Sequence, residues 1–142
     1  MCLTANRDDP LTGKHSIKFD EKGYAICWKT YDTCGSYLES PYYPTFHVKN
    51  GWIISDRKDK KICTENGDWE YRVLNGKYVD IGHGIHVFIL EKDAEEEMEA
   101  EGCAIVPVRC HKSQLVAIDN DEPVAVFMKV FLKKADYKKA LK

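Results

Sequence analysis

The sequence predicts an α+β fold: a single compact domain built on a mostly antiparallel, twisted sheet, with one short acidic helix and a short C-terminal helix. Three observations predict it. Apolar and polar residues alternate along several short stretches, as in half-buried strands. Two Asn-Gly dipeptides, at 50–51 and 75–76, supply tight-turn signals between such stretches. Residues 91–101 instead have an acidic surface and a narrow apolar stripe with helical spacing.

Size and charge restrict the function classes. A chain of 142 residues fits one domain and can bury about 68–70% of its unfolded surface. Its net charge of −2 produces no field that favours nucleic acid or an anionic membrane surface. Nucleic acid and membrane are therefore not expected partners.

The first residues are polar and rich in turn formers, so residues 1–16 are expected to form a flexible arm before a single domain at 17–142. They lack the apolar core of a secretory signal, and no apolar run approaches the roughly 20 residues that a membrane span needs. We therefore expect a cytoplasmic protein. In that reducing compartment the six cysteines, none of them in a C-x-x-C pair, are expected to be mostly free thiols.

The first half of the domain predicts strands and turns. Residues 23–31 alternate, with Tyr24, Ile26 and Trp28 on one face and the residues between them on the other. Two hairpins are expected around the Asn-Gly dipeptides, one joining 45–48 to 51–55 and one joining 68–74 to 77–81.

The second half begins with a predicted strand at 84–90, in which Ile85, Val87 and Ile89 face away from His86, Phe88 and Leu90. A short helix should follow. Asp93 with Glu96 resembles a capping box, and Gly102 stands where a left-handed cap would end the helix.

Two further strands and a tail complete the expected fold. Residues 103–110 predict a strand in which Pro107 favours an edge or a bulge, because proline cannot donate to a ladder. Residues 124–132 are apolar on nearly both faces, which is typical of a central strand. A lysine-rich helix is expected from Ala135 onward.

Metal-ligand side chains gather in one part of the sequence: His83, His86, Cys103, Cys110 and His111. Neighbouring residues of a regular strand point to opposite faces, so His83 and His86, or Cys110 and His111, are poorly placed to share an ion. We therefore expect no metal site. A cysteine nucleophile would need a thiol, a histidine and an orienting group together, and no local motif brings these together.

No phosphate-binding, zinc-protease or serine-hydrolase motif occurs. The order of strand "GIHVF", helix near Ala94, strand "AIVPVR" and Glu122 before strand "VAVFMKV" resembles the second half of ADP-ribosyltransferase-like domains. That resemblance implies NAD as the cofactor, His86 on the nicotinamide side and Glu122 stabilising an oxocarbenium charge. Outside this alternative, no cofactor is expected.

A broader resemblance concerns origin. "YLESPYY", "GWIIS", "GIHVF" and "VFMKVFL" are similar to segments of small bacteriophage-encoded proteins, some of which, such as anti-CRISPR proteins, inhibit host defence. The resemblance implies a protein of the host cytoplasm.

The leading functional hypothesis is a small soluble binding protein that inhibits a host protein or sequesters a small nucleotide signal. Tyrosine and tryptophan supply large contact areas, so Tyr42, Tyr43 and Trp52 are candidate anchors, with core packing as the alternative for each. Arg57 and Arg109 are candidate clamps for a phosphate or a partner, although solvation at the surface is the alternative for Arg57. An enzymatic role stays open through the NAD-using alternative.

Overall fold

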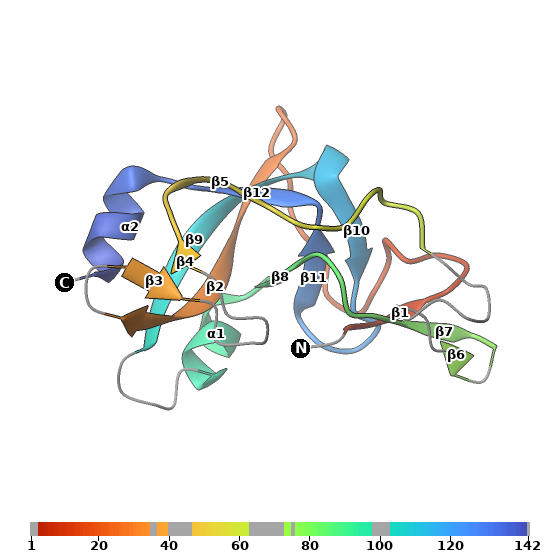
Figure 1. Cartoon of the computed structure of the whole chain (residues 1–142). Helices are drawn as coiled ribbons and strands as arrows, with labels where there is room; N and C mark the ends of the chain where they lie inside the picture. Colours follow the sequence, from red (N-terminus) through yellow and green to blue (C-terminus); the bar gives the residue numbers. More distant parts are fainter. Residues whose placement is uncertain are drawn as a thin grey trace.

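The computed structural model describes residues 3–34, 37–39, 47–62, 73–74, 76–97 and 103–141. Strands dominate, and two short helices accompany them (Figure 1). The strands are β1 Leu3–Asn6, β2 Tyr24–Cys34, β3 Tyr37–Glu39, β4 His47–Val48, β5 Gly51–Ile54, β6 Val73–Leu74, β7 Tyr78–Ile81, β8 Ile85–Phe88, β9 Cys103–His111, β10 Leu115–Ile118, β11 Val124–Phe127 and β12 Lys129–Leu132. The helices are α1 Glu91–Glu97 and α2 Lys134–Ala140, and a 3₁₀ turn spans Lys112–Gln114.

Within the described ranges the strands form two sheets. The larger follows the order β10-β11-β8-β2-β9-β12-β5, with β3 added to β2 and β4 to β3, and the smaller follows β1-β7-β6. Their strand pairs are antiparallel, which confirms the predicted mostly antiparallel sheet with two helices. Figure 1 shows the smaller sheet at one end of the molecule and α2 at the other.

The larger sheet curls back on itself. In the sheet, β11 and β12 are separated by β8, β2 and β9. In the chain, β12 follows β11 directly after Met128. At this break the Met128 N–H donates to the Gln114 carbonyl at 2.8 Å, and the Met128 carbonyl accepts from the Ser55 N–H at 2.9 Å. The single central strand predicted over 124–132 is therefore wrong. The segment is two strands with different neighbours, and its apolar pattern does not reveal the bend because both halves are buried in the sheet.

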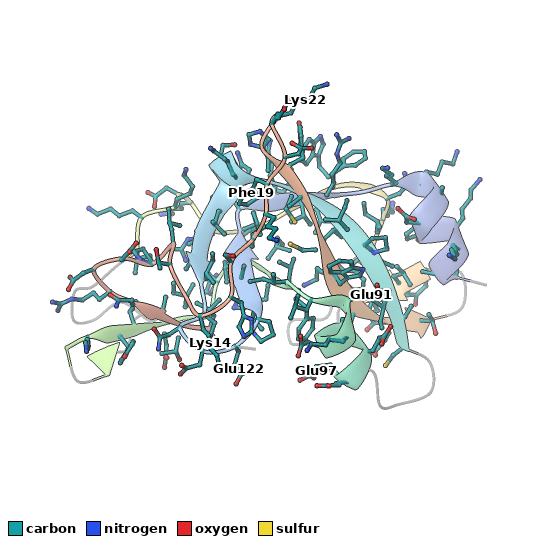
Figure 2. The ribbon with its side chains drawn as sticks, turned by 180° about the vertical axis from the view of Figure 1, so that it is seen from behind. Lys14, Phe19, Lys22, Glu91, Glu97 and Glu122 are labelled. Atoms are coloured by element: carbon teal, nitrogen blue, oxygen red, sulfur yellow. The ribbon has the colours of Figure 1, made fainter. Side chains whose placement is uncertain are left out.

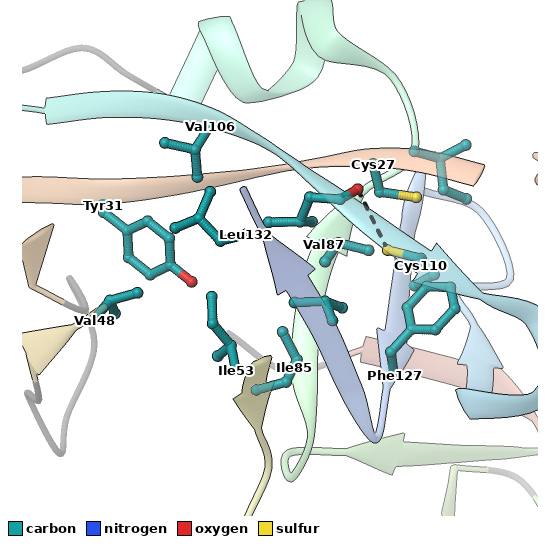
Figure 3. Packing of buried hydrophobic residues seen from close by; sticks show 14 of the residues in the cluster. Cys27, Tyr31, Val48, Ile53, Ile85, Val87, Val106, Cys110, Phe127 and Leu132 are labelled. Carbon is teal, nitrogen blue, oxygen red and sulfur yellow. Dashed lines mark hydrogen bonds between the residues drawn. The ribbon is translucent and has the colours of Figure 1, made fainter. Parts of the chain in front are cut away.

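Two clusters of buried side chains lie on the two sides of this sheet. The inner cluster is lined by residues such as Tyr31, Val87 and Phe127, and Figure 3 shows them converging between the strands. The second cluster includes Leu3, Phe88 and Val126. Since the consecutive residues Val87 and Phe88 enter different clusters, the predicted alternation is confirmed within β8. The predicted strand extended to Leu90, but Ile89 and Leu90 follow β8 and both pack on the inner cluster.

The amino-terminal segment differs from the expected flexible arm. Leu3–Asn6 pairs with Tyr78–Ile81, and both Leu3 and Ala5 are fully buried. The Thr4 N–H also donates to the Asp119 carboxylate at 2.9 Å. Only two apolar residues alternate here, so the local pattern is too short to distinguish a strand from polar coil.

Of the two expected hairpins, the described residues of the first pair elsewhere, and those of the second, Val73–Leu74, pair as expected. Near the first Asn-Gly dipeptide, Val48 pairs with Leu38 and Gly51 pairs with Leu132, so β4 and β5 join different partners. Near the second dipeptide, Val73 pairs with Val79. A local turn signal sets a chain reversal, but competing strands elsewhere decide the pairing.

Pro107 lies inside β9 without a bulge in the pairing with β2, and among the described residues its other side is unpaired, as the expected edge position requires. It sits opposite Trp28 in an unbroken register from Tyr24↔His111 to Asp32↔Cys103, and β12 follows β9 on the other side. The ladder to β12 consists of the pair Phe131↔Arg109. Pro107 is tolerated because no described strand residue pairs with it on that side.

The acidic segment forms α1, which begins at Glu91 rather than at the expected capping box. Asp93 lies in its first turn, where the helix dipole favours acidic side chains, and Ala94 is buried against the sheet. Gly102 lies outside the described residues. The C-terminal helix is confirmed as α2. In the ranges described, no helix has the length and apolar character needed to cross a membrane.

Replacing Asp119 should test how firmly the amino-terminal strand is held. This 9%-exposed carboxylate accepts the N–H groups of Thr4, Asp121 and Glu122, so Asp119→Ala leaves several donors without an acceptor. We expect a loss of about 2–3 kcal/mol in unfolding free energy by urea titration. The exposed Asp121→Ala is the control and should change stability by less than about 0.5 kcal/mol.

Candidate binding face

Exposed apolar residues gather on one face of the larger sheet. Large hydrophobic residues exposed in the described part of the chain are Leu11, Ile26, Trp52 and Ile54. All but Leu11 lie on the side of the sheet that faces away from the inner cluster. We call this surface the aromatic–basic face, which consists of Tyr24 and Ile26 from β2, Arg109 and His111 from β9, Lys129 and Phe131 from β12, and Trp52 and Ile54 from β5.

The sheet register sets these residues side by side. Ile26 pairs with Arg109, Arg109 with Phe131, and Phe131 with Trp52, which makes one row across four strands. Two residues along each strand, and so on the same face, Tyr24 pairs with His111 and Lys129 pairs with Ile54. Residues up to 87 positions apart in the sequence, Tyr24 and His111 (111 − 24), thereby become cross-strand neighbours.

Trp52 and its neighbours form a packed group at one side of the face. The Phe131 ring meets the Trp52 ring edge-on, with centroids 5.2 Å apart. The Lys129 ammonium lies 4.6 Å from the Trp52 ring centroid, within the range of a cation–π contact. Trp52 is still 52% exposed, so most of this indole is open to contact.

Tyr24 organises the other side in the same way. The Arg109 guanidinium lies 4.3 Å from its ring centroid, and the His111 ring packs edge-on at 4.7 Å. His111 Nε2 is 2.9 Å from the Lys22 carbonyl, and Asp20 accepts the Lys22 and Tyr24 N–H groups. The Tyr24 N–H is the main reason that the pKa of Asp20 lies below its ordinary value. The rings and cations of the face are therefore held in place before any partner arrives.

Among the described residues no carboxylate lies at ion-pair distance from the two cations of the face, and Asp20 interacts with the Arg109 charge only over a longer distance. Lys129 and Arg109 contact rings, and a ring satisfies none of the directional N–H donors at the edge of a guanidinium. The face therefore combines exposed apolar area with positive groups that retain hydrogen-bonding capacity.

Two of the residues singled out from the sequence, Trp52 and Arg109, are brought together on this face. Tyr42 and Tyr43 lie outside the described residues. Reasoning from the sequence missed Ile26, Ile54, Phe131 and Lys129 as site residues. Strand alternation places each on a solvent-facing side, but nothing local shows that their strands are neighbours.

Arg57 is not available as a surface clamp. It is 8% exposed, and its guanidinium donates to the backbone carbonyls of Asp59, Lys61 and His83 at 2.8, 2.9 and 3.2 Å. These bonds connect the loop after β5 to the segment before β8. We expected Arg57 either to bind a phosphate or to be solvated at the surface. Instead, its buried side chain holds a loop through backbone carbonyls.

His86 and Glu122, the pair implied by the NAD-using resemblance, are not brought together. His86 is 9% exposed, its ring nitrogens lie 3.1 Å from the Ile81 carbonyl and 3.3 Å from the Gly84 carbonyl, and burial lowers its pKa to about 4. Its cross-strand neighbour is Val126, whereas Glu122 precedes β11 in a turn in which the Val124 N–H donates to the Glu122 carbonyl at 2.8 Å. Glu122 is exposed at the end of the sheet near Lys14 (Figure 2).

The five metal-ligand side chains have separate surroundings. His83 contacts Asp56 at 3.1 Å, the Cys103 thiol donates to Asp32 at 3.4 Å, and Cys110 is buried in the inner cluster. Among the described residues no three histidine, cysteine or acidic side chains are grouped as metal ligands would be. Cys27, Cys103 and Cys110 are free thiols.

The interior also contains polar groups that sequence analysis did not single out. The Lys29 ammonium donates to the His86 carbonyl at 2.7 Å, and burial lowers its pKa to about 8. The Tyr31 hydroxyl is buried and has no hydrogen-bond partner among the residues that the structure describes, and burial raises its pKa. These groups make the interior sensitive to pH.

No protein-family model, no curated protein and no solved structure matches this chain. The candidate site is therefore argued from its own geometry.

Lys29 should make stability depend on alkaline pH. Because its folded pKa of about 8 lies below the ordinary 10.5, its charge destabilises the fold below pH 8, and the cost is lost as the pH rises to 10.5. The unfolding free energy of wild type relative to Lys29→Met should therefore increase by about 3 kcal/mol between pH 8 and 10.5. Chemical denaturation of both proteins at matched pH measures this. A constant difference contradicts the assignment.

His86 should produce a loss of stability in acid. Its folded pKa of about 4 lies below 6.5, so the unfolded chain binds the proton first, and stability falls as the pH drops from 6.5 to 4. We expect wild type to lose about 3 kcal/mol more than His86→Gln over this range, by denaturation at each pH. His15→Gln is the control and should behave as wild type.

Proposed function

We propose that this is a small binding protein that docks onto a protein partner through the aromatic–basic face. The observation that carries the proposal is the concentration of Ile26, Trp52 and Ile54, at 46, 52 and 70% exposure, on one sheet surface. Large apolar side chains exposed together on one surface mark interaction sites. Tryptophan, tyrosine and arginine, the residues that dominate binding energy at interfaces, all occur in it.

The packing of side chains within the aromatic–basic face also supports a binding function. Each ring of the face is packed against a neighbour from another strand, and Arg109 and Lys129 lie against rings. A surface that is ordered before binding loses less side-chain entropy on association, so more of its contact energy appears as affinity.

A protein partner fits better than a single-stranded nucleic acid. Binding of bases to a sheet uses open aromatic planes and a groove of cations that follows the phosphates. Here cations already lie against the rings of Tyr24 and Trp52, and Ile26 and Ile54 offer no plane for stacking. The net charge of −2 adds no general attraction to a polyanion.

The proposal develops the expectation of a host-directed inhibitor. A binding protein of this kind inhibits by occupying a surface of its target. The alternatives receive less support from the geometry: the guanidinium of Arg57 is engaged by loop carbonyls, and His86 is buried far from Glu122.

Affinity capture with matched surface variants tests this function. Trp52→Ser combined with Ile54→Ser removes exposed apolar area from the face, whereas Leu11→Ser removes a comparably exposed residue elsewhere. We expect a protein captured from the producing cells by wild type and by Leu11→Ser, and at least tenfold weaker binding by the double variant in titrations with that protein.

Nuclease treatment before elution separates the partner classes. Retention of the captured protein after treatment agrees with the proposal, and its loss together with recovered nucleic acid contradicts it. Equal binding by the double variant and the Leu11→Ser control would also contradict it. Melting temperatures of the three proteins should agree closely, because exposed positions contribute little to stability.

A further inference from the structure

The charge pattern of the aromatic–basic face identifies the chemistry of its partner. Building on the proposed function, we infer that the face accepts an acidic segment of a protein in which two carboxylates are flanked by apolar side chains. The carboxylates pair with Arg109 and Lys129, and the apolar side chains pack on the outer strands.

The order of side chains across the face carries this inference. The outer strands β5 and β2 present Trp52, Ile54, Tyr24 and Ile26, and the two cations stand on the strands between them. The pattern is therefore apolar, basic, basic, apolar across four adjacent strands. A complementary segment has its acids in the middle and its apolar residues at the ends.

The two cations stand on neighbouring strands, but their charged groups lie over different rings. Arg109 pairs with Phe131, and Lys129 lies two residues before Phe131 on the same face. The Arg109 guanidinium lies over the Tyr24 ring of β2, and the Lys129 ammonium lies over the Trp52 ring of β5. Two separate carboxylates are therefore needed, one for each cation.

Desolvation explains why the partner needs carboxylates as well as apolar groups. Docking onto Trp52 and Ile26 removes water from the cations between them, and neither cation has a carboxylate at ion-pair distance among the described residues. An unpaired cation inside an interface is costly, whereas a carboxylate satisfies guanidinium and ammonium donors. Arg109 and Lys129 therefore favour the binding of an acidic segment and disfavour that of a neutral apolar segment.

Three synthetic peptides of equal length test the inference directly. The probe has the central sequence Leu-Thr-Glu-Thr-Glu-Thr-Leu, and its controls replace both Glu by Gln or by Lys. Amide and indole NMR shifts of the full chain report the site. We expect the acidic peptide to shift Trp52 and the strands β2, β5, β9 and β12, and to bind at least tenfold more tightly than the Gln peptide.

Charge reversal provides the matched variant. Arg109→Glu combined with Lys129→Glu should reverse the preference, so that the Lys peptide becomes the tighter ligand at low salt. Equal affinity of wild type for the Glu and Gln peptides, or no binding by either, overturns the inference. If an oligothymidine probe binds to the same face and none of the three peptides binds, the inference is also overturned, in favour of a nucleic acid partner.

The partner captured in cells distinguishes the inference from the proposed function. If Arg109→Gln with Lys129→Gln binds it as wild type does, while Trp52→Ser with Ile54→Ser does not, the acidic chemistry is wrong and the docking face stands. If both double variants bind as wild type does, the docking face itself is wrong. Loss of binding by both supports the two together.

Discussion

The bend of the chain at Met128 is the constraint on which the rest of the structure depends. It lets one apolar segment complete the sheet at both ends of the path through β8, β2 and β9, so the sheet closes around its inner cluster. The same bend places Phe131 and Lys129 on the outer side, between Arg109 and Trp52. The inner cluster and the aromatic–basic face therefore lie on opposite sides of the same strands.

Helix α1 covers only part of the outer side of the larger sheet, and the aromatic–basic face lies on the part that it leaves open. Ala94 of α1 belongs to the second cluster, against which Trp28 and Ile105 pack, so this helix covers one end of β2 and β9. The other end, at Ile26 and Arg109, has no such cover and remains exposed. An apolar surface left open beside a covered one, with its side chains held in place, is suited to receive another molecule.

Polar groups inside the sheet make the stability of the fold depend on pH. Lys29 and His86 share a hydrogen bond through the His86 carbonyl, and burial disfavours the charged form of both. Burial of such groups costs stability that a hydrocarbon side chain would not. The hydrogen bond from Lys29 to the His86 carbonyl links β2 to β8 and so helps to specify the register of these two strands.

Local patterns in the sequence determined the element types: the alternation of Val87 and Phe88 between two clusters, the helix around Ala94, the turn before Lys77 and the helix after Lys133. They follow from side-chain periodicity and turn chemistry, which act over a few residues. Tertiary structure alone decided that Leu3 is buried, that Gly51 pairs with Leu132 and that 124–132 bends. It also brought Trp52 beside Phe131 and Arg109, because strand neighbours depend on competition between distant segments for backbone partners and buried area, which no local pattern encodes.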